Sequence, residues 1–97
     1  MRTSVITKKT AADTQQFHFG GADLPATINV DGSLGVAETI AVNVVGFNGT
    51  DLTAATDDSG AALVLSSART IILIKGPCVL QFVKPVTVAA VGLFVQR

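Results

Sequence analysis

The chain has 97 residues, the size of a single domain, and seven basic and seven acidic side chains leave it without formal net charge. Charged residues make up 14% of the chain and hydrophobic residues 48%, whereas about 25% of a typical soluble domain is charged. The balanced charge excludes a conventional nucleic-acid-binding protein, because such proteins carry a positive excess that releases counterions from phosphates.

Residues 1–14 are polar and include the pair Lys8-Lys9. They are predicted to form an N-terminal arm or an edge strand, with a possible strand at residues 4–8, while residues 15–97 form the folded domain. No apolar stretch follows Met1, so we expect no signal peptide. The longest apolar run, residues 86–95, is about half of the roughly 20 residues that a membrane helix needs.

The rest of the chain consists of short apolar or alternating runs separated by glycine, proline and aspartate. Turn signals are Asp31-Gly32 and Asn48-Gly49, expected as type I′ hairpin turns, together with residues 57–60, Gly76-Pro77 and Pro85. The pattern predicts an all-β single domain, an antiparallel β-sandwich that is jelly-roll-like or immunoglobulin-like. Its strands are predicted at residues 4–8, 15–19, 26–30, 38–45, 52–56, 62–66, 70–75, 79–84 and 86–95.

Alternation within these runs predicts which side chains form the core. The run at residues 70–75 is apolar at successive positions and is predicted to be buried on both faces. The predicted core consists of Ile28, Val30, Ile40, Val42, Val44, Leu65, Ile72, Ile74, Leu80, Phe82, Val91 and Leu93.

The sequence contains no grouping of residues typical of an enzyme or a cofactor site. His18 is the only histidine and has no motif that supplies a nucleophile or an orienting carboxylate. Cys78, the only cysteine, is predicted to be a buried small hydrophobic residue. Asp51, Asp57 and Asp58 lack the ligand spacing of a calcium loop and are predicted to form turns. We therefore predict no catalytic residue, no metal and no cofactor.

Two segments resemble the small capsid-associated proteins of tailed bacteriophages. One is the strand–Gly-Pro–strand–Lys-Pro ending, which runs from Thr70 through Gly76-Pro77 and Lys84-Pro85 to Val95. The other is Gly46-Phe47-Asn48-Gly49-Thr50-Asp51 with residues 52–56 after it. The resemblance implies a decoration or cement protein, a small β-domain, often a trimer, that clamps neighbouring major capsid subunits on the virion surface after synthesis in the host cytoplasm.

The composition agrees with a protein that works as part of an assembly. A small domain with few charges gains stability when another protein covers part of its surface. We expect a homo-oligomer, most simply a trimer, that binds the major capsid protein and neither nucleic acid nor membrane. Predicted contact residues are Arg2, Lys8, Lys9, Phe17, His18 and Phe19, with the loops around Phe47 and Asp57 as the other choice. Two alternative roles stay open: another phage structural module (tail, fibre or spike base), and a cytoplasmic β-domain that binds a ligand or peptide.

Overall fold

The computed structural model describes residues 2–56 and 59–97. This part of the chain contains nine strands and a short 3-10 helix, η1 (Gly21–Asp23). The strands are β1 (Arg2–Lys9), β2 (Asp13–Phe19), β3 (Ala26–Asp31), β4 (Ile40–Val45), β5 (Leu52–Ala54), β6 (Val64–Leu65), β7 (Ile71–Ile74), β8 (Cys78–Lys84) and β9 (Val91–Gln96).

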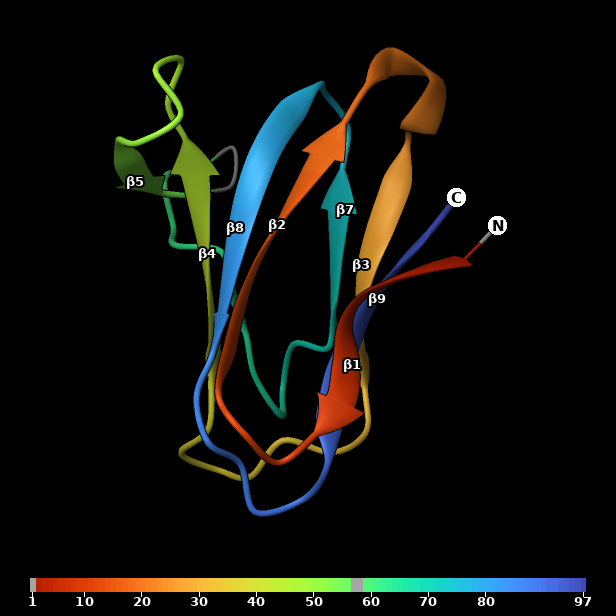
Figure 1. Ribbon diagram of the computed structural model, residues 1–97, viewed down its shortest axis with the longest axis vertical. Helices are drawn as coiled ribbons and strands as arrows, with labels where there is room; N and C mark the ends of the chain where they lie inside the picture. The colour runs from red at the N-terminus through yellow and green to blue at the C-terminus, as the bar shows by residue number, and fades with distance from the viewer. Residues whose placement is uncertain (1, 57–58) are drawn as a thin grey trace.

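The strands form two antiparallel sheets that pack face to face (Figure 1), so the predicted β-sandwich is confirmed. One sheet has the order β1-β9-β3-β7 and the other the order β2-β8-β4-β5, with β6 also paired to β4. The pairs are nested along the chain: β1 with β9, β2 with β8, β3 with β7, and β4 with β5 and β6. This nested pairing across two sheets is the topology of a jelly roll.

The core lies between the sheets and is filled by alternate residues of the strands. Nearly all predicted core side chains are buried, and Phe82, Ile28 and Ile40 have no exposed surface. Two predictions were wrong in part: Val30 is half-buried, and Val44 is exposed because it lies where the sandwich opens. Core side chains that the prediction omitted are Ile6, Phe19, Ala26, Leu34, Ala55 and Val95.

The run at residues 70–75 is not buried on both faces, as was predicted. Ile72 and Ile74 point into the core, but Ile71 and Leu73 are 57% and 53% exposed. The reason is that β7 lies at the edge of its sheet, where the outer face is open to solvent. The predicted strand at residues 86–95 is also shorter, since residues 86–90 form the loop before β9.

Neither predicted type I′ turn is found, because such a turn needs positive φ at both central residues. Among the described residues only Gly32, Gly49 and Gly60 have positive φ. Gly32 does not close a hairpin at all, since β3 and β4 belong to different sheets. Asn48-Gly49 does lie in the hairpin between β4 and β5, within a longer loop.

Residues 2–19 contain two consecutive strands, β1 and β2, that lie in different sheets at one side of the sandwich (Figure 1). β1 is an edge strand of one sheet, paired with β9, and β2 is an edge strand of the other, paired with β8. β1 carries Ile6 into the core, and its register with β9 shifts on either side of that residue.

Candidate docking surface

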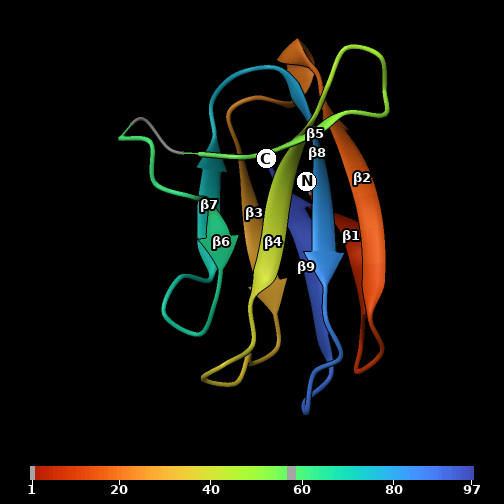
Figure 2. The same cartoon turned by 90° about the vertical axis from the view of Figure 1, so that its left-hand side faces the viewer.

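The outer face of the sheet β2-β8-β4-β5 carries no charged side chain, and we call it the neutral face. Directly paired residues of neighbouring strands point to the same side, so the register defines its members. They are Thr14, Gln16 and His18 of β2; Val79, Gln81 and Val83 of β8; Ala41, Asn43 and Val45 of β4; and Leu52 and Ala54 of β5. Figure 2 shows these strands from the side of this face.

Amide side chains cross the middle of the neutral face. Gln16 lies opposite Gln81, which lies opposite Asn43 on the next strand. The Asn43 amide Nδ2 donates a hydrogen bond to Gln81 Oε1 at 3.4 Å. Each amide offers donors and an acceptor, so this row can bind polar groups of a partner without any charge being desolvated.

The outer face of the other sheet differs, because it does carry charge. The Arg2 guanidinium lies 5.2 Å from the centre of the Phe94 ring, and Asp31 is exposed where β3 ends. The centre of a protein interface is depleted of charged side chains. The neutral face is therefore the better candidate for docking.

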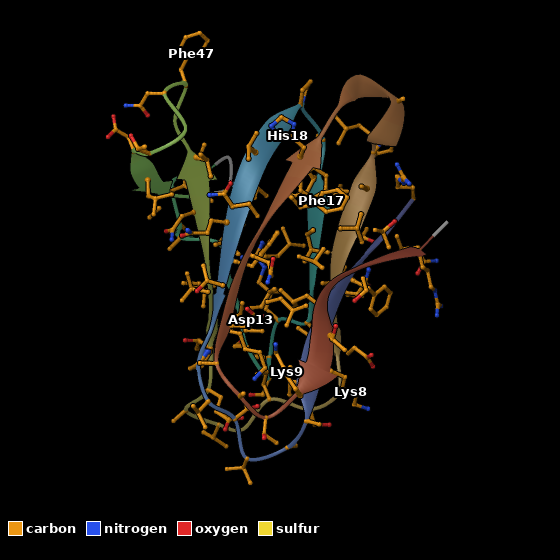
Figure 3. All side chains as sticks on the ribbon, in the orientation of Figure 1. Lys8, Lys9, Asp13, Phe17, His18 and Phe47 are labelled. Carbon is orange, nitrogen blue, oxygen red and sulfur yellow. The ribbon has the colours of Figure 1, made fainter. Side chains whose placement is uncertain are left out.

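The loop between β4 and β5 projects beyond the neutral face and presents Phe47, which is fully exposed (Figure 3). Asn48 fixes this loop: its Oδ1 accepts from the N–H groups of Thr50 and Asp51, both at 3.1 Å. Its Nδ2 donates to Asp51 Oδ2 at 3.0 Å. An aromatic ring held out by an ordered loop loses little entropy on binding, which is the property of an interface anchor.

A groove of about 520 Å³ lies between this loop and the end of the β2–β8 pair. His18 and Val79 line one side, and Val45, Gly46 and Phe47 line the other. The groove is continuous with the neutral face, because three of these residues belong to both. Together they give a flat uncharged surface with one hollow and one projecting ring at its end.

The predicted contact residues are separated by the structure rather than gathered. Lys8 and Lys9 lie at the end of β1, next to the turn that leads into β2, while Phe17 and His18 lie toward the far end of β2 (Figure 3). Lys9 Nζ forms an ion pair with Asp13 Oδ2 at 2.9 Å, and this hydrogen bond lowers the pKa of Asp13.

The two phenylalanines of β2 point inward. Phe19 is a buried core residue, and Phe17 packs partly buried against the core with its ring centre 4.8 Å from that of Phe19. His18 is exposed on the opposite side of the strand, in the neutral face. Of the predicted contact set, only His18 therefore belongs to the candidate surface, while Arg2 belongs to the outer face of the other sheet.

Lys84 is the buried charged group of the described chain, with only 1% of its surface exposed. Its Nζ donates to the carbonyl oxygens of Ala11 at 2.8 Å and Pro85 at 3.1 Å, and to Thr87 Oγ1 at 3.1 Å. The Thr87 hydroxyl in turn donates to the carbonyl of Ala89 at 2.7 Å. Burial is the main cause that lowers the pKa of Lys84. The hydrogen bonds around its ammonium group connect the turn after β1 with the loop before β9.

The described residues hold no other arrangement that suggests chemistry. Within residues 2–56 and 59–97 there is no cluster of three or more potential metal ligands. Burial raises the pKa of the Cys78 thiol, which opposes formation of a reactive thiolate. Asp51 holds the Phe47 loop, while Asp57 and Asp58 lie outside the described residues. The described helix, η1, is far too short to cross a membrane.

The sequence prediction did not assemble the neutral face, although it assigned parts of it. Alternation within each run places Val79, Gln81 and Val83 on one side of a strand and Asn43 on the side away from the core. These side chains form one surface only because β4 pairs with β8. The local sequence of either strand does not reveal that pairing. Lys84 was also missed, yet it continues the inward series of Cys78, Leu80 and Phe82.

Comparison of the chain with protein-family models, with curated proteins and with solved structures gives no match.

Proposed function

We propose that this domain is a structural virion protein that decorates a bacteriophage capsid and stabilises it by clamping neighbouring major capsid subunits. The observation that carries the proposal is the neutral face, a sheet surface without charge beside the projecting Phe47. A surface of this composition is matched to burial against another protein. The resemblance of residues 46–56 and 70–95 to capsid-associated proteins supports the major capsid protein as the partner.

The fold is compatible with this role, since jelly rolls occur in viral capsid domains as well as in lectins. A fold alone does not assign a function, so the argument depends on the surface. Docking through the neutral face leaves the remaining surface free for contacts between copies, as a trimer on the capsid requires.

The test compares two asparagine-to-lysine variants on the two outer faces of the sandwich. Asn43→Lys places a charge in the neutral face, and Asn29→Lys places the same charge on the outer face of the other sheet; both positions are half-buried in inner strands. Capsids of the phage that carries the gene, prepared without this protein, are mixed with each variant and sedimented. Asn43→Lys is expected to lose at least about tenfold in affinity, because docking then buries an unpaired charge.

Asn29→Lys should bind capsids as the unmodified protein does, with saturation at a fixed number of copies per particle. Equal binding by both variants would show that the docking surface lies outside the neutral face. If the unmodified protein does not sediment with capsids, the proposed function is wrong. Electron microscopy of decorated particles then gives the number of copies at each site and tests the trimer.

A further inference from the structure

The strand β2 has one edge without a partner strand. It stands at the end of the order β2-β8-β4-β5, and no other strand of the described chain pairs with its outer side (Figure 2). β1, which precedes it in the chain, belongs to the other sheet. The outer edge of β2 therefore presents backbone N–H and C=O groups to solvent, where another strand can bind them.

The hydrogen bonds of β4 show which residues of β2 carry these outward groups. The N–H of Gly46 donates to the carbonyl of Asp51 at 2.7 Å, and the N–H of Ala55 to the carbonyl of Val42 at 3.0 Å. Even-numbered residues of this strand therefore bond toward β5, and odd-numbered residues bond toward β8. The register of β8 extends the alternation to β2, whose odd-numbered residues bond to β8. The residues of β2 with outward groups are Thr14, Gln16 and His18.

β2 lacks the features that protect the edge strand β1. β1 carries three cations and two shifts in register, both of which oppose pairing with another chain. β2 pairs with β8 over its whole length without a shift, and it contains no lysine or arginine. Its one carboxylate, Asp13, is its first residue and forms an ion pair with Lys9. A regular exposed edge of this kind accepts another strand.

The sequence of β2 is complementary to itself about a two-fold axis at Gln16. In an antiparallel pair of two copies centred there, Gln16 lies opposite Gln16 of the other copy, and Thr14 lies opposite His18. The outward backbone groups then face each other, as the hydrogen-bonded pairs of an antiparallel ladder require. Amide meets amide and hydroxyl meets imidazole, so each side chain has a group with which it can hydrogen-bond. No like charges are opposed, because Asp13 lies opposite Phe19.

The groups near the ends of β2 do not oppose this arrangement. The two-fold axis places the Lys9 end of one copy beside the Phe19 end of the other, so the lysines of the two copies stay apart. At the first end the N–H of Thr14 donates to Asp13 Oδ1 at 2.8 Å. This hydrogen bond is exposed to solvent, so exchanging it for one with the second copy costs little. Pairing therefore depends mainly on the backbone groups of Gln16 and His18.

We propose that two copies of this protein associate by antiparallel pairing of their β2 edges, with Gln16 on the two-fold axis. The two sheets β2-β8-β4-β5 then form one continuous sheet, on which the two neutral faces lie side by side. This contact goes beyond the proposed docking on capsids and describes the protein in solution. A two-fold contact is complete with two copies, so a trimer on the capsid uses other contacts between copies.

The test measures self-association of the isolated protein by sedimentation velocity over a range of concentrations. One strand pair buries little area, so we expect a weak dimer that forms between about 10 μM and about 1 mM protein. Gln16→Lys and Gln16→Glu should each weaken association about fivefold, because like charges meet on the axis. An equimolar mixture of these two variants should dimerise at least as tightly as the unmodified protein, since opposite charges then meet.

Gln81 provides the matched control, because it lies beside Gln16 on the same face but on the inner strand β8. Gln81→Lys and Gln81→Glu should each dimerise as the unmodified protein does. Amide hydrogen exchange gives a readout specific to the edge. Gln16 and His18 should exchange more slowly as the protein concentration rises, while Gln15 and Phe17, which bond to β8, are protected at every concentration.

Three results would overturn the proposal. They are a monomer at every concentration, a trimer in place of a dimer, and concentration-dependent protection of a strand other than β2. Association of the Gln16 variants that equals that of the unmodified protein would contradict the register about Gln16 and overturn it as well. No capsid is present, so this test fails or succeeds independently of the proposed function.

Discussion

Lys84 shows how one buried cation can hold several loops. Its ammonium group joins the turn between β1 and β2, through Ala11, to the loop that leads into β9, through Pro85 and Thr87. The N–H of Thr87 also donates to the carbonyl of Thr10 at 2.9 Å. The segment from β1 to β2 is thereby fixed at its turn as well as along its two strands.

Replacement of Lys84 by methionine should therefore destabilise the domain. Methionine fills a similar volume but leaves the carbonyls of Ala11 and Pro85 without their donor, at an expected cost of about 1–3 kcal/mol in the free energy of unfolding. Urea unfolding measures this loss. Lys8→Met, at an exposed position of β1, is the control and should change stability by less than about 0.5 kcal/mol.

Glu38 joins two loops at the same end of the sandwich and gives a pH-dependent contribution to stability. Its Oε1 accepts from the N–H of Gly35 at 2.7 Å, and its Oε2 from that of Val88 at 2.8 Å. These two backbone hydrogen bonds hold the pKa of Glu38 below the ordinary value of 4.5. The folded state therefore binds this proton less readily than the unfolded state does.

The sign of the effect follows from linkage. The stabilisation is fully present above the ordinary pKa of glutamate and is lost as the pH falls through the lowered value. Glu38→Gln should thus melt at a lower temperature at neutral pH, with a smaller decrease on acidification to about pH 3. Thermal melts across this range measure it, with Asp31→Asn as the control for an exposed carboxylate. Parallel pH profiles for Glu38→Gln and the unmodified protein would contradict the assignment.

At the scale of elements, the pairing of β1 with β9 depends on Gly92. A Cβ atom at this position would lie 2.5 Å from the carbonyl oxygen of Ile6 and 2.8 Å from the amide nitrogen of Lys8. Both are backbone atoms of β1, so they cannot move aside as a flexible side chain would. The close approach occurs where the register of β1 shifts.

Gly92→Ala is expected to cost about 2 kcal/mol or more in the free energy of unfolding, because β1 must move outward and carry Ile6 away from the core. Gly76→Ala is the matched control: a Cβ atom there meets nothing within 4 Å. Denaturant unfolding compares the two variants. A Gly92→Ala protein as stable as the control would show that β1 is not held as described.

The elements also show what sequence can and cannot predict. Each of the nine described strands overlaps a run that the sequence predicted, because strand alternation is local, although bounds differ, as for β9 (Val91–Gln96) against the predicted 86–95. Whether a strand is inner or edge depends on partners far away in the chain. For this reason the apolar run of β7 was wrongly assigned as buried on both faces, and the neutral face, made from four separate segments, was not foreseen.

At the scale of the whole molecule, the neutral face and the β7 edge belong to different sheets (Figure 2). A partner that docks on the neutral face therefore leaves the other sheet accessible.

The position of β9 has a consequence for how the chain acquires its structure during synthesis. β9 lies between β1 and β3 in its sheet, although it is the last of the nine strands to leave the ribosome. Until it emerges, β1 has no partner in that sheet, and two strands made early present unpaired backbone to the surrounding solution. Folding of this sheet therefore cannot be completed before β9 has emerged, and it is slow, since its contacts join distant parts of the chain. During that interval the nascent protein is most exposed to aggregation and most dependent on chaperones.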